Sequence, residues 1–184
     1  MIKKILILLL LIVHTNAKDP ETQDLDEFTP PISIRSVLSG DFLGSGKDRN
    51  WVIRNIPVTE DILRDDPFAG FNLGAVQFVL VDTKDTCLAI LETGLFGIKS
   101  CKEDLDRKEY ETLYTIIPTT TPAVQIRSFV LSKNECMVAF KNPRLPRGRG
   151  IGLRPCDVDR WLNVSMDVLF LLNPPIRDAV LINP

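Results

Sequence analysis

A segment of 44 to 48 residues recurs three times along this chain, and this repeat restricts the fold more than any other feature. The copies open with similar strand-like runs in which Ser33, Gln77 and Gln125 take equivalent places; 44 positions separate the first pair and 48 the second. The triplet Ile-Arg-Ser is identical at 34–36 and 126–128. Repeats of this length bury an apolar face only by packing on one another.

Each copy is rich in short strands. β-Branched and aromatic runs alternate with clusters of Gly, Asp, Asn and Pro, which is typical of strands joined by turns. Short helical turns are expected only in loops, at 60–65 and 102–111. A propeller of four-stranded blades needs about four blades or more, so three copies of about four strands predict a closed barrel instead. We therefore predict an all-β fold of the β-trefoil type over residues 32–175.

Four cysteines fit the same repeat: Cys87, Cys101, Cys136 and Cys156. The paired C-x-x-C spacing of zinc sites is missing, so two disulfides are predicted, for which three pairings are possible. In the second and third copies one cysteine begins a strand and the other ends its neighbour, which places the two side by side in a hairpin. We therefore predict the pairs Cys87–Cys101 and Cys136–Cys156, and none in the first copy.

The two ends of the chain differ from the repeats. Residues 1–17 have the pattern of a signal peptide, with Lys3 and Lys4, an apolar run over 5–13 and a cleavage site after Ala17. The apolar run is too short to span a bilayer, which needs about 20 residues, so we expect export to the periplasm. Residues 18–31 are acidic and predicted to form an extended tail, and residues 176–184 a second tail.

The composition excludes several classes of function. The only histidine is His14, inside the predicted signal peptide, so the exported part lacks histidine-based catalysis and the commonest metal ligand. We therefore predict no catalytic site, no metal site and no cofactor. Without Lys3 and Lys4 the chain has 20 basic and 24 acidic residues, a net charge of −4. That charge is unfavourable for a nucleic-acid partner.

Several runs carry a resemblance to known proteins. Cys-Leu-Ala-Ile-Leu-Glu at 87–92 and Phe-Gly-Ile-Lys-Ser-Cys at 96–101 are similar to ricin-B-type lectin domains. The most specific run is Ile-Ile-Pro-Thr-Thr-Thr-Pro-Ala-Val-Gln-Ile-Arg-Ser at 116–128. Together with the opening near residue 34 and the Pro-Pro at 174–175, it resembles the C-type subunits of the cytolethal distending toxins. The resemblance extends through essentially the whole exported chain.

This resemblance implies a function. In that family, the A-type and C-type subunits are ricin-like trefoils that bind the host cell and carry the B-type subunit, which is a DNase-I-like nuclease. The chain is then expected to be a non-catalytic cell-binding and delivery subunit of a heterotrimer, secreted or held at the outer membrane. The N-terminal segment of the C-type subunit lies against the nuclease, which implies nuclease contacts by Asp24, Asp26, Glu27 and Phe28. A disordered, solvated leader is the alternative interpretation of this tail.

A second candidate contact is the basic segment from Lys141 to Arg154. It lies inside the second predicted disulfide loop and contains no acidic residue. Its loop arginines, Arg144, Arg147 and Arg149, suggest contact with an acidic partner or with anionic membrane headgroups. The alternative is a solvated hairpin loop that arginine keeps soluble.

Sugar and cholesterol patterns are weak. The Gln-x-Trp motif of ricin-type lectins is missing. We therefore expect Trp51, Tyr114 and Trp161 to lie in the core rather than to contact a sugar. A reversed cholesterol-recognition pattern is formed by Lys108, Tyr110 and Leu113. This pattern adds a cholesterol-rich membrane to a host glycoconjugate as a possible cell-surface partner.

Two other functions are compatible with the predicted fold, because a fold does not fix a function. A free-standing carbohydrate-binding lectin module needs intact sugar-site motifs, which are missing. A Kunitz-type trefoil protease inhibitor has a similar length, a signal peptide and two disulfides. It also needs a rigid reactive loop in the first repeat, and the sequence shows no convincing one.

Overall fold

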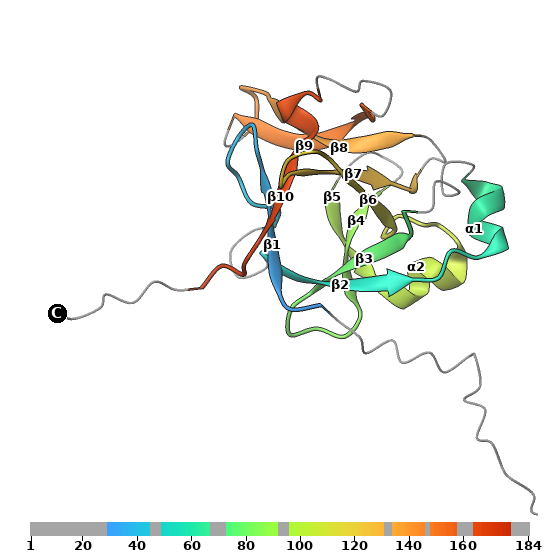
Figure 1. Cartoon of the computed structure of the whole chain (residues 1–184). Coiled ribbons are helices and arrows are strands. Elements are labelled where there is room, and N and C mark those ends of the chain that lie inside the picture. The colour runs from blue at the N-terminus through green and yellow to red at the C-terminus, as the bar shows by residue number, and fades with distance from the viewer. Residues whose placement is uncertain are drawn as a thin grey trace, which may run out of the picture.

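The computed structural model describes residues 29–44, 49–66, 73–91, 96–130, 134–145, 148–157 and 164–177. Strands dominate this part of the chain (Figure 1). They are β1 (Ile32–Ser36), β2 (Asn50–Ile56), β3 (Ala75–Leu80), β4 (Thr86–Ile90), β5 (Phe96–Ser100), β6 (Tyr114–Pro118), β7 (Val124–Ser128), β8 (Glu135–Lys141), β9 (Arg149–Pro155) and β10 (Phe170–Asn173). The helical elements are α1 (Glu60–Asp65), α2 (Cys101–Arg107) and the 3-10 turn η4 (Met166–Val168). The mainly β architecture agrees with the prediction.

Six of the strands form a closed ring. β1 pairs with β2, β2 with β3, β3 with β6, β6 with β7, β7 with β10, and β10 with β1, all antiparallel. Because the last strand returns to the first, this ring has no exposed edge. Each of its three hairpin-like pairs comes from one copy of the repeat, as the equivalent registers Ile32↔Trp51, Val76↔Tyr114 and Val124↔Phe170 show.

Two hairpins extend from the ring at equivalent places. β4 joins β3 through Val79↔Cys87 and continues into β5, and β8 joins β7 through Arg127↔Cys136 and continues into β9. In the first copy, the corresponding pairing is a single bridge between Arg35 and Phe42. The three copies therefore differ chiefly in their hairpins, and only the hairpins of the second and third copies carry cysteines.

The core repeats the same threefold pattern. Fully or almost fully buried apolar side chains occupy matching places in the three copies: Ile34, Phe78 and Ile126; Trp51, Tyr114 and Phe170; Leu43, Leu88 and Met137. Burying one such large side chain stabilises the fold by about 1.5–3 kcal/mol. Trp51 and Tyr114 therefore lie in the core, as expected. In the third copy the matching aromatic residue is Phe170, whereas Trp161 lies outside the described residues.

Contacts with β2 extend the folded unit slightly beyond the predicted boundaries. The backbone N–H of Thr29 donates to the Ile53 carbonyl, and the Thr29 hydroxyl accepts from the Ile53 N–H. The side chain of Asn50 exchanges two hydrogen bonds with the backbone of Ile176. The two ends of the described chain thus contact the same strand. Their contact points, Asn50 and Ile53, lie about 10 Å apart along β2 at the usual rise per residue.

Some predictions concern residues outside the described ranges. These are the signal peptide at 1–17, the tail residues Asp24, Asp26, Glu27 and Phe28, and the loop residue Arg147. Among the residues that the structure describes, no helix combines the length and apolar character required to cross a bilayer.

Candidate interaction surfaces

The two predicted disulfides are both present. Cys87 bonds to Cys101 and Cys136 to Cys156, with Cα–Cα distances of 5.1 and 4.8 Å. Each closes the base of one hairpin, because Cys87 and Cys136 lie where these hairpins meet the ring. The pairing matches the one predicted from the repeat.

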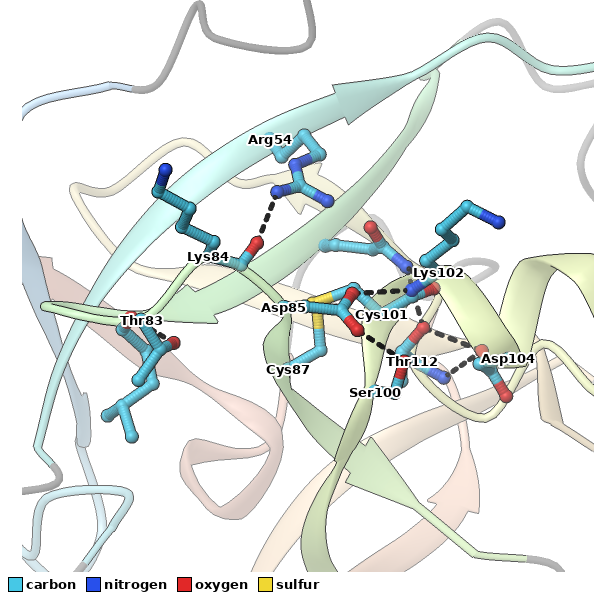
Figure 2. The surroundings of a disulfide bond; sticks show 12 residues. Arg54, Thr83, Lys84, Asp85, Cys87, Ser100, Cys101, Lys102, Asp104 and Thr112 are labelled. Atoms are coloured by element: carbon cyan, nitrogen blue, oxygen red, sulfur yellow. Dashed lines mark hydrogen bonds between the residues drawn. A yellow bond between two sulfur atoms is a disulfide. The ribbon is translucent and has the colours of Figure 1, made fainter.

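The first disulfide also fixes the start of α2 (Figure 2). The Ser100 hydroxyl accepts from the Glu103 N–H, and Asp85 accepts from the Ser100 hydroxyl and from the Lys102 N–H. These bonds satisfy N–H groups that the first turn of a helix leaves without partners. Slight burial of the Asp85 carboxyl opposes its ionisation, but these hydrogen bonds outweigh that effect and lower its pKa.

A lysine surrounded by carboxylates lies beside this helix. Lys99 of β5 pairs with Asp104 of α2 and with Glu109 and Glu111 of the following loop. Asp104 is fully buried, and its oxygens also accept from the backbone N–H groups of Glu111 and Thr112 and from the Thr112 hydroxyl. The three carboxylates lie within 4.8 Å of one another. The Lys99 ammonium is therefore the cation shared by the only such group of three acids found in the described residues.

Contacts within this cluster shift the pKa values of Lys99 and Glu109. Burial opposes the charged form of Lys99, but the hydrogen bonds that its ammonium donates to Glu109, Glu111 and Asp104 outweigh this effect and raise the pKa of Lys99. The hydrogen bond from Lys99 lowers the pKa of Glu109 below its ordinary value of 4.5. The stabilisation linked to Glu109 is thus complete above pH 4.5 and is lost as the pH falls through the lowered folded-state pKa.

Lys99→Met should lower the free energy of unfolding by about 2 kcal/mol at neutral pH, because the buried Asp104 loses its cation. Below about pH 4.5 the difference in the free energy of unfolding between wild type and the variant should become smaller. Wild type loses the stabilisation linked to the lowered pKa of Glu109, whereas the variant lacks this stabilisation at every pH. Denaturant unfolding at neutral and acidic pH measures both effects. The control Lys102→Met removes an exposed cation that pairs with Asp106, and it should change stability by less than about 0.5 kcal/mol. A difference that widens in acid would contradict the pairing.

The residues of the cholesterol-type pattern do not form a surface. Tyr110 is 8% exposed and Leu113 is 0% exposed, and both pack in a cluster with Ile62 and Phe129. Only Lys108 reaches solvent, where it pairs with Asp61. Burial therefore argues against lipid contact by Tyr110 and Leu113, because such contact would require this cluster to open.

A buried ion pair, which sequence reasoning missed, joins this cluster to the ring. Arg127 of β7 pairs with Asp66, the residue that ends α1, and both side chains are almost completely buried. The Arg127 guanidinium also lies over the Phe129 ring, 4.9 Å from its centroid. No signal in the sequence separates this arginine from Arg35, which occupies the same place in the first Ile-Arg-Ser triplet.

The basic hairpin, defined as residues 136–156, combines exposed cations with one aromatic ring. Lys141 and Arg144 are exposed, whereas Arg149 donates to the Ser39 carbonyl and pairs with Asp41 at 3.3 Å. Phe140, which is 38% exposed, lies across Gly150 and Gly152 of β9. The Gly-x-Gly spacing opposite an aromatic residue is the signal that could have indicated this arrangement.

These surfaces are suited to binding rather than to covalent chemistry. Many of the described charged side chains form ion pairs that hold loops in place, including Lys99 with its three carboxylates and Arg154 with Asp157 and Asp167. The exposed features are hairpins and turns around a closed ring. Such a rigid scaffold with variable loops is a common way to present contact surfaces.

Comparisons with known proteins agree with this fold. The solved structure of cytolethal distending toxin from Actinobacillus actinomycetemcomitans contains a chain that is 24% identical, with a TM-score of 0.59, and the match covers 90% of this chain and 100% of that one. The toxin from Haemophilus ducreyi gives 23% identity, the same TM-score and the same coverage. At these identities the two structures support the fold alone. The comparison with curated proteins gave no significant match.

The sequence model of one protein family covers most of the chain. That family is described as the cytolethal distending toxin A/C domain, and its model matches residues 31–181. The matched range contains the ten strands of the described residues, both disulfides and the basic hairpin. This chain therefore belongs to the cytolethal distending toxin A/C domain family.

Proposed function

We propose that this chain is a C-type subunit of a cytolethal distending toxin and that it folds as a β-trefoil. The observation that carries the proposal is the family match over residues 31–181, and the A/C subunits of this family are non-catalytic binding subunits. The choice of type C over type A is supported by the run at 116–128, which contains the end of β6, the threonine-rich turn after it and all of β7.

The pairing pattern supports the trefoil assignment. Six strands close into one ring, and the bridges Arg35↔Phe42, Val79↔Cys87 and Arg127↔Cys136 take equivalent places in three copies. Three hairpin-like units around a common axis, with a hairpin departing from each, are what a trefoil requires. The two strands missing from a set of twelve belong to the first copy, where residues 45–48 lie outside the described ranges.

The subunit acts by assembly. It joins a second trefoil subunit of type A and a DNase-I-like nuclease of type B, and the complex attaches to the host cell surface. Export through the signal peptide at 1–17 brings it to the periplasm, where the two disulfides form in an oxidising environment. The complex is then secreted or retained at the outer membrane.

Co-purification tests this assembly. The full chain is co-expressed with an A-type subunit and the nuclease, and one affinity tag on the nuclease is used for capture. All three chains are expected in a single complex by size-exclusion chromatography. Capture of the nuclease and the A-type subunit without this chain would contradict the proposal.

The acidic tail contributes to holding the nuclease. A nuclease cleft attracts phosphates and so has positive potential, which suits Asp24, Asp26 and Glu27, with Phe28 as an apolar anchor. Support comes from the position of Thr29, whose two hydrogen bonds to Ile53 attach the start of the folded unit to β2. The tail therefore leaves the fold from a fixed point.

Deletion of residues 18–28 should weaken retention of the nuclease about tenfold and raise the nuclease activity of the complex that remains. The deletion stops before Thr29 so that its bonds to β2 persist, and the melting temperature should stay unchanged. Asp24→Asn, Asp26→Asn and Glu27→Gln together separate charge from length. If both retention and nuclease activity equal those of wild type, the tail has no such role.

A further inference from the structure

The basic hairpin differs in charge from the rest of the chain. Between Cys136 and Cys156 the sequence has five cations and no acidic residue, although the exported chain has a net charge of −4. The hairpin lies at one end of the ring, beside the turn at 37–41 of the first copy (Figure 1). A single-sign segment in an acidic protein attracts anions locally while the rest of the surface repels them.

The cations are not equally available. Arg154 lies between Asp157 and Asp167, at 2.8 and 3.5 Å, and is neutralised. Arg149 has one nitrogen occupied by Ser39 and Asp41, which fixes its orientation. Lys141 and Arg144 are exposed, and their side chains form no ion pair within the described residues. These two side chains can therefore reach an external anion without breaking an existing pair.

Phe140 supplies a flat apolar surface next to these charges. A Cβ atom built on Gly150 would lie 2.7 Å from the ring atom Cζ, and one built on Gly152 would lie 3.1 Å from Cε1. The ring thus spans both glycines and rests on the backbone of β9. Leu145 closes one side, since its Cδ1 atom would also be 2.7 Å from a Cβ on Gly150. With 38% of the residue exposed, part of the Phe140 side chain remains accessible to solvent.

The arrangement of charge around the ring indicates the type of ligand. Phe140 and Lys141 are neighbours on one strand, so Lys141 and its partner Arg149 project from the opposite face of the hairpin. Arg144 lies in the turn at the tip. Cations on one face and at the tip, with the aromatic ring on the other face, suit a chain-like polyanion that passes around the end of the hairpin. A flat bilayer would meet one face only, and a ring lying against the sheet is not a protruding anchor.

We propose that the tip of the basic hairpin binds a sulfated glycan chain, with Lys141, Arg144 and Arg149 contacting sulfate groups and Phe140 stacking against the apolar face of a sugar ring. Guanidinium groups bind oxyanions through paired hydrogen bonds, and aromatic faces are common in sugar-sized sites. This inference rests on the proposed cell-binding role and names the chemistry of its ligand.

The test uses the full exported chain and a sulfated heparin octasaccharide, with its desulfated counterpart as a second probe. Calorimetry should show binding of the sulfated probe alone. Lys141→Gln with Arg144→Gln should weaken binding about tenfold and reduce its salt dependence. The matched control, Lys102→Gln with Arg107→Gln, removes the same charge from exposed positions of α2 and should leave affinity within about twofold.

Phe140→Leu tests the ring separately. Leucine still covers the glycines but offers no flat face, so affinity should fall severalfold while the salt dependence stays the same. Melting temperatures of all variants exclude unfolding as the cause. Vesicles with about one-third anionic phospholipid test the membrane alternative. Co-purification with the A-type and nuclease subunits on the same preparations distinguishes failure of assembly from failure of glycan binding.

Three outcomes would overturn the inference. They are no binding of the sulfated octasaccharide, equal losses in the hairpin and α2 variants, and binding to anionic vesicles without binding to the sulfated probe. Specific loss in the hairpin variants, with sulfate-dependent binding by wild type, would support it.

Discussion

Asp66→Asn is expected to lower the free energy of unfolding by about 3–5 kcal/mol, since it removes the carboxylate that pairs with the buried Arg127 guanidinium. The pair joins the end of α1 to β7, and both side chains are almost completely excluded from water. Asparagine keeps the shape of the side chain, so the loss reports charge rather than packing. Denaturant unfolding followed by tryptophan fluorescence and circular dichroism measures it.

The neighbouring Asp65 provides a matched control. Its side chain is 40% exposed and lies 3.6 Å from Arg64, so Asp65→Asn should change stability by less than about 0.5 kcal/mol. Combining Asp66→Asn with Arg127→Met also removes the buried positive charge of Arg127. The double variant should recover much of the lost free energy of unfolding, because apolar replacements of buried ion pairs are often well tolerated. Equal effects of the two asparagine variants would show that the buried pair does not stabilise the fold.

Replacing Cys87 and Cys101 with serine should lower the free energy of unfolding by about 3 kcal/mol, and so should replacing Cys136 and Cys156. The two bonds join residues 14 and 20 positions apart, so the entropy they remove from the unfolded chain is similar. Loss of the first bond should also reduce amide protection in α2, because Cys101 is the first residue of that helix.

Reductant titration distinguishes the two disulfides. Cys87, Cys101 and Cys136 are fully buried, whereas Cys156 is 9% exposed, so the Cys136–Cys156 bond should be reduced first. Mass spectrometry of alkylated samples measures the order in which the two disulfides are reduced. A variant without cysteines serves as the control, because reductant and alkylation should leave its mass unchanged. Loss of the Cys87–Cys101 bond first would contradict the order expected from exposure.

Much of the fold could be predicted because the same pattern of strand and turn residues recurs three times along the sequence. The repeat spacing placed Trp51 and Tyr114 in equivalent core positions and paired the cysteines, since both depend on which residues face each other across neighbouring strands. The cholesterol-type pattern remains a prediction, although burial argues against lipid contact by Tyr110 and Leu113. A short pattern of residue types contains no information about burial, and the structure places Tyr110 and Leu113 in a packed cluster.

The candidate surfaces required the three-dimensional structure. Phe140 lies against Gly150 and Gly152 only because β8 and β9 pair in one register, and a shift by one residue would turn the ring to the other face. Lys99 meets its three carboxylates because β5, α2 and the next loop converge. Neither arrangement follows from composition or spacing, because each joins residues from different elements.

The two Ile-Arg-Ser triplets are identical in sequence, but their arginine side chains lie in different environments. By itself the sequence determined the three copies, their strand openings and the cysteine pairs, because these depend on periodicity along the chain. Only the tertiary structure decided that Arg35 is exposed, with its guanidinium 5.4 Å from the Phe42 ring centroid, while Arg127 is buried against Asp66. The physical reason is the insertion between β2 and β3, whose helix α1 brings a carboxylate to one copy of the repeat and not to the other.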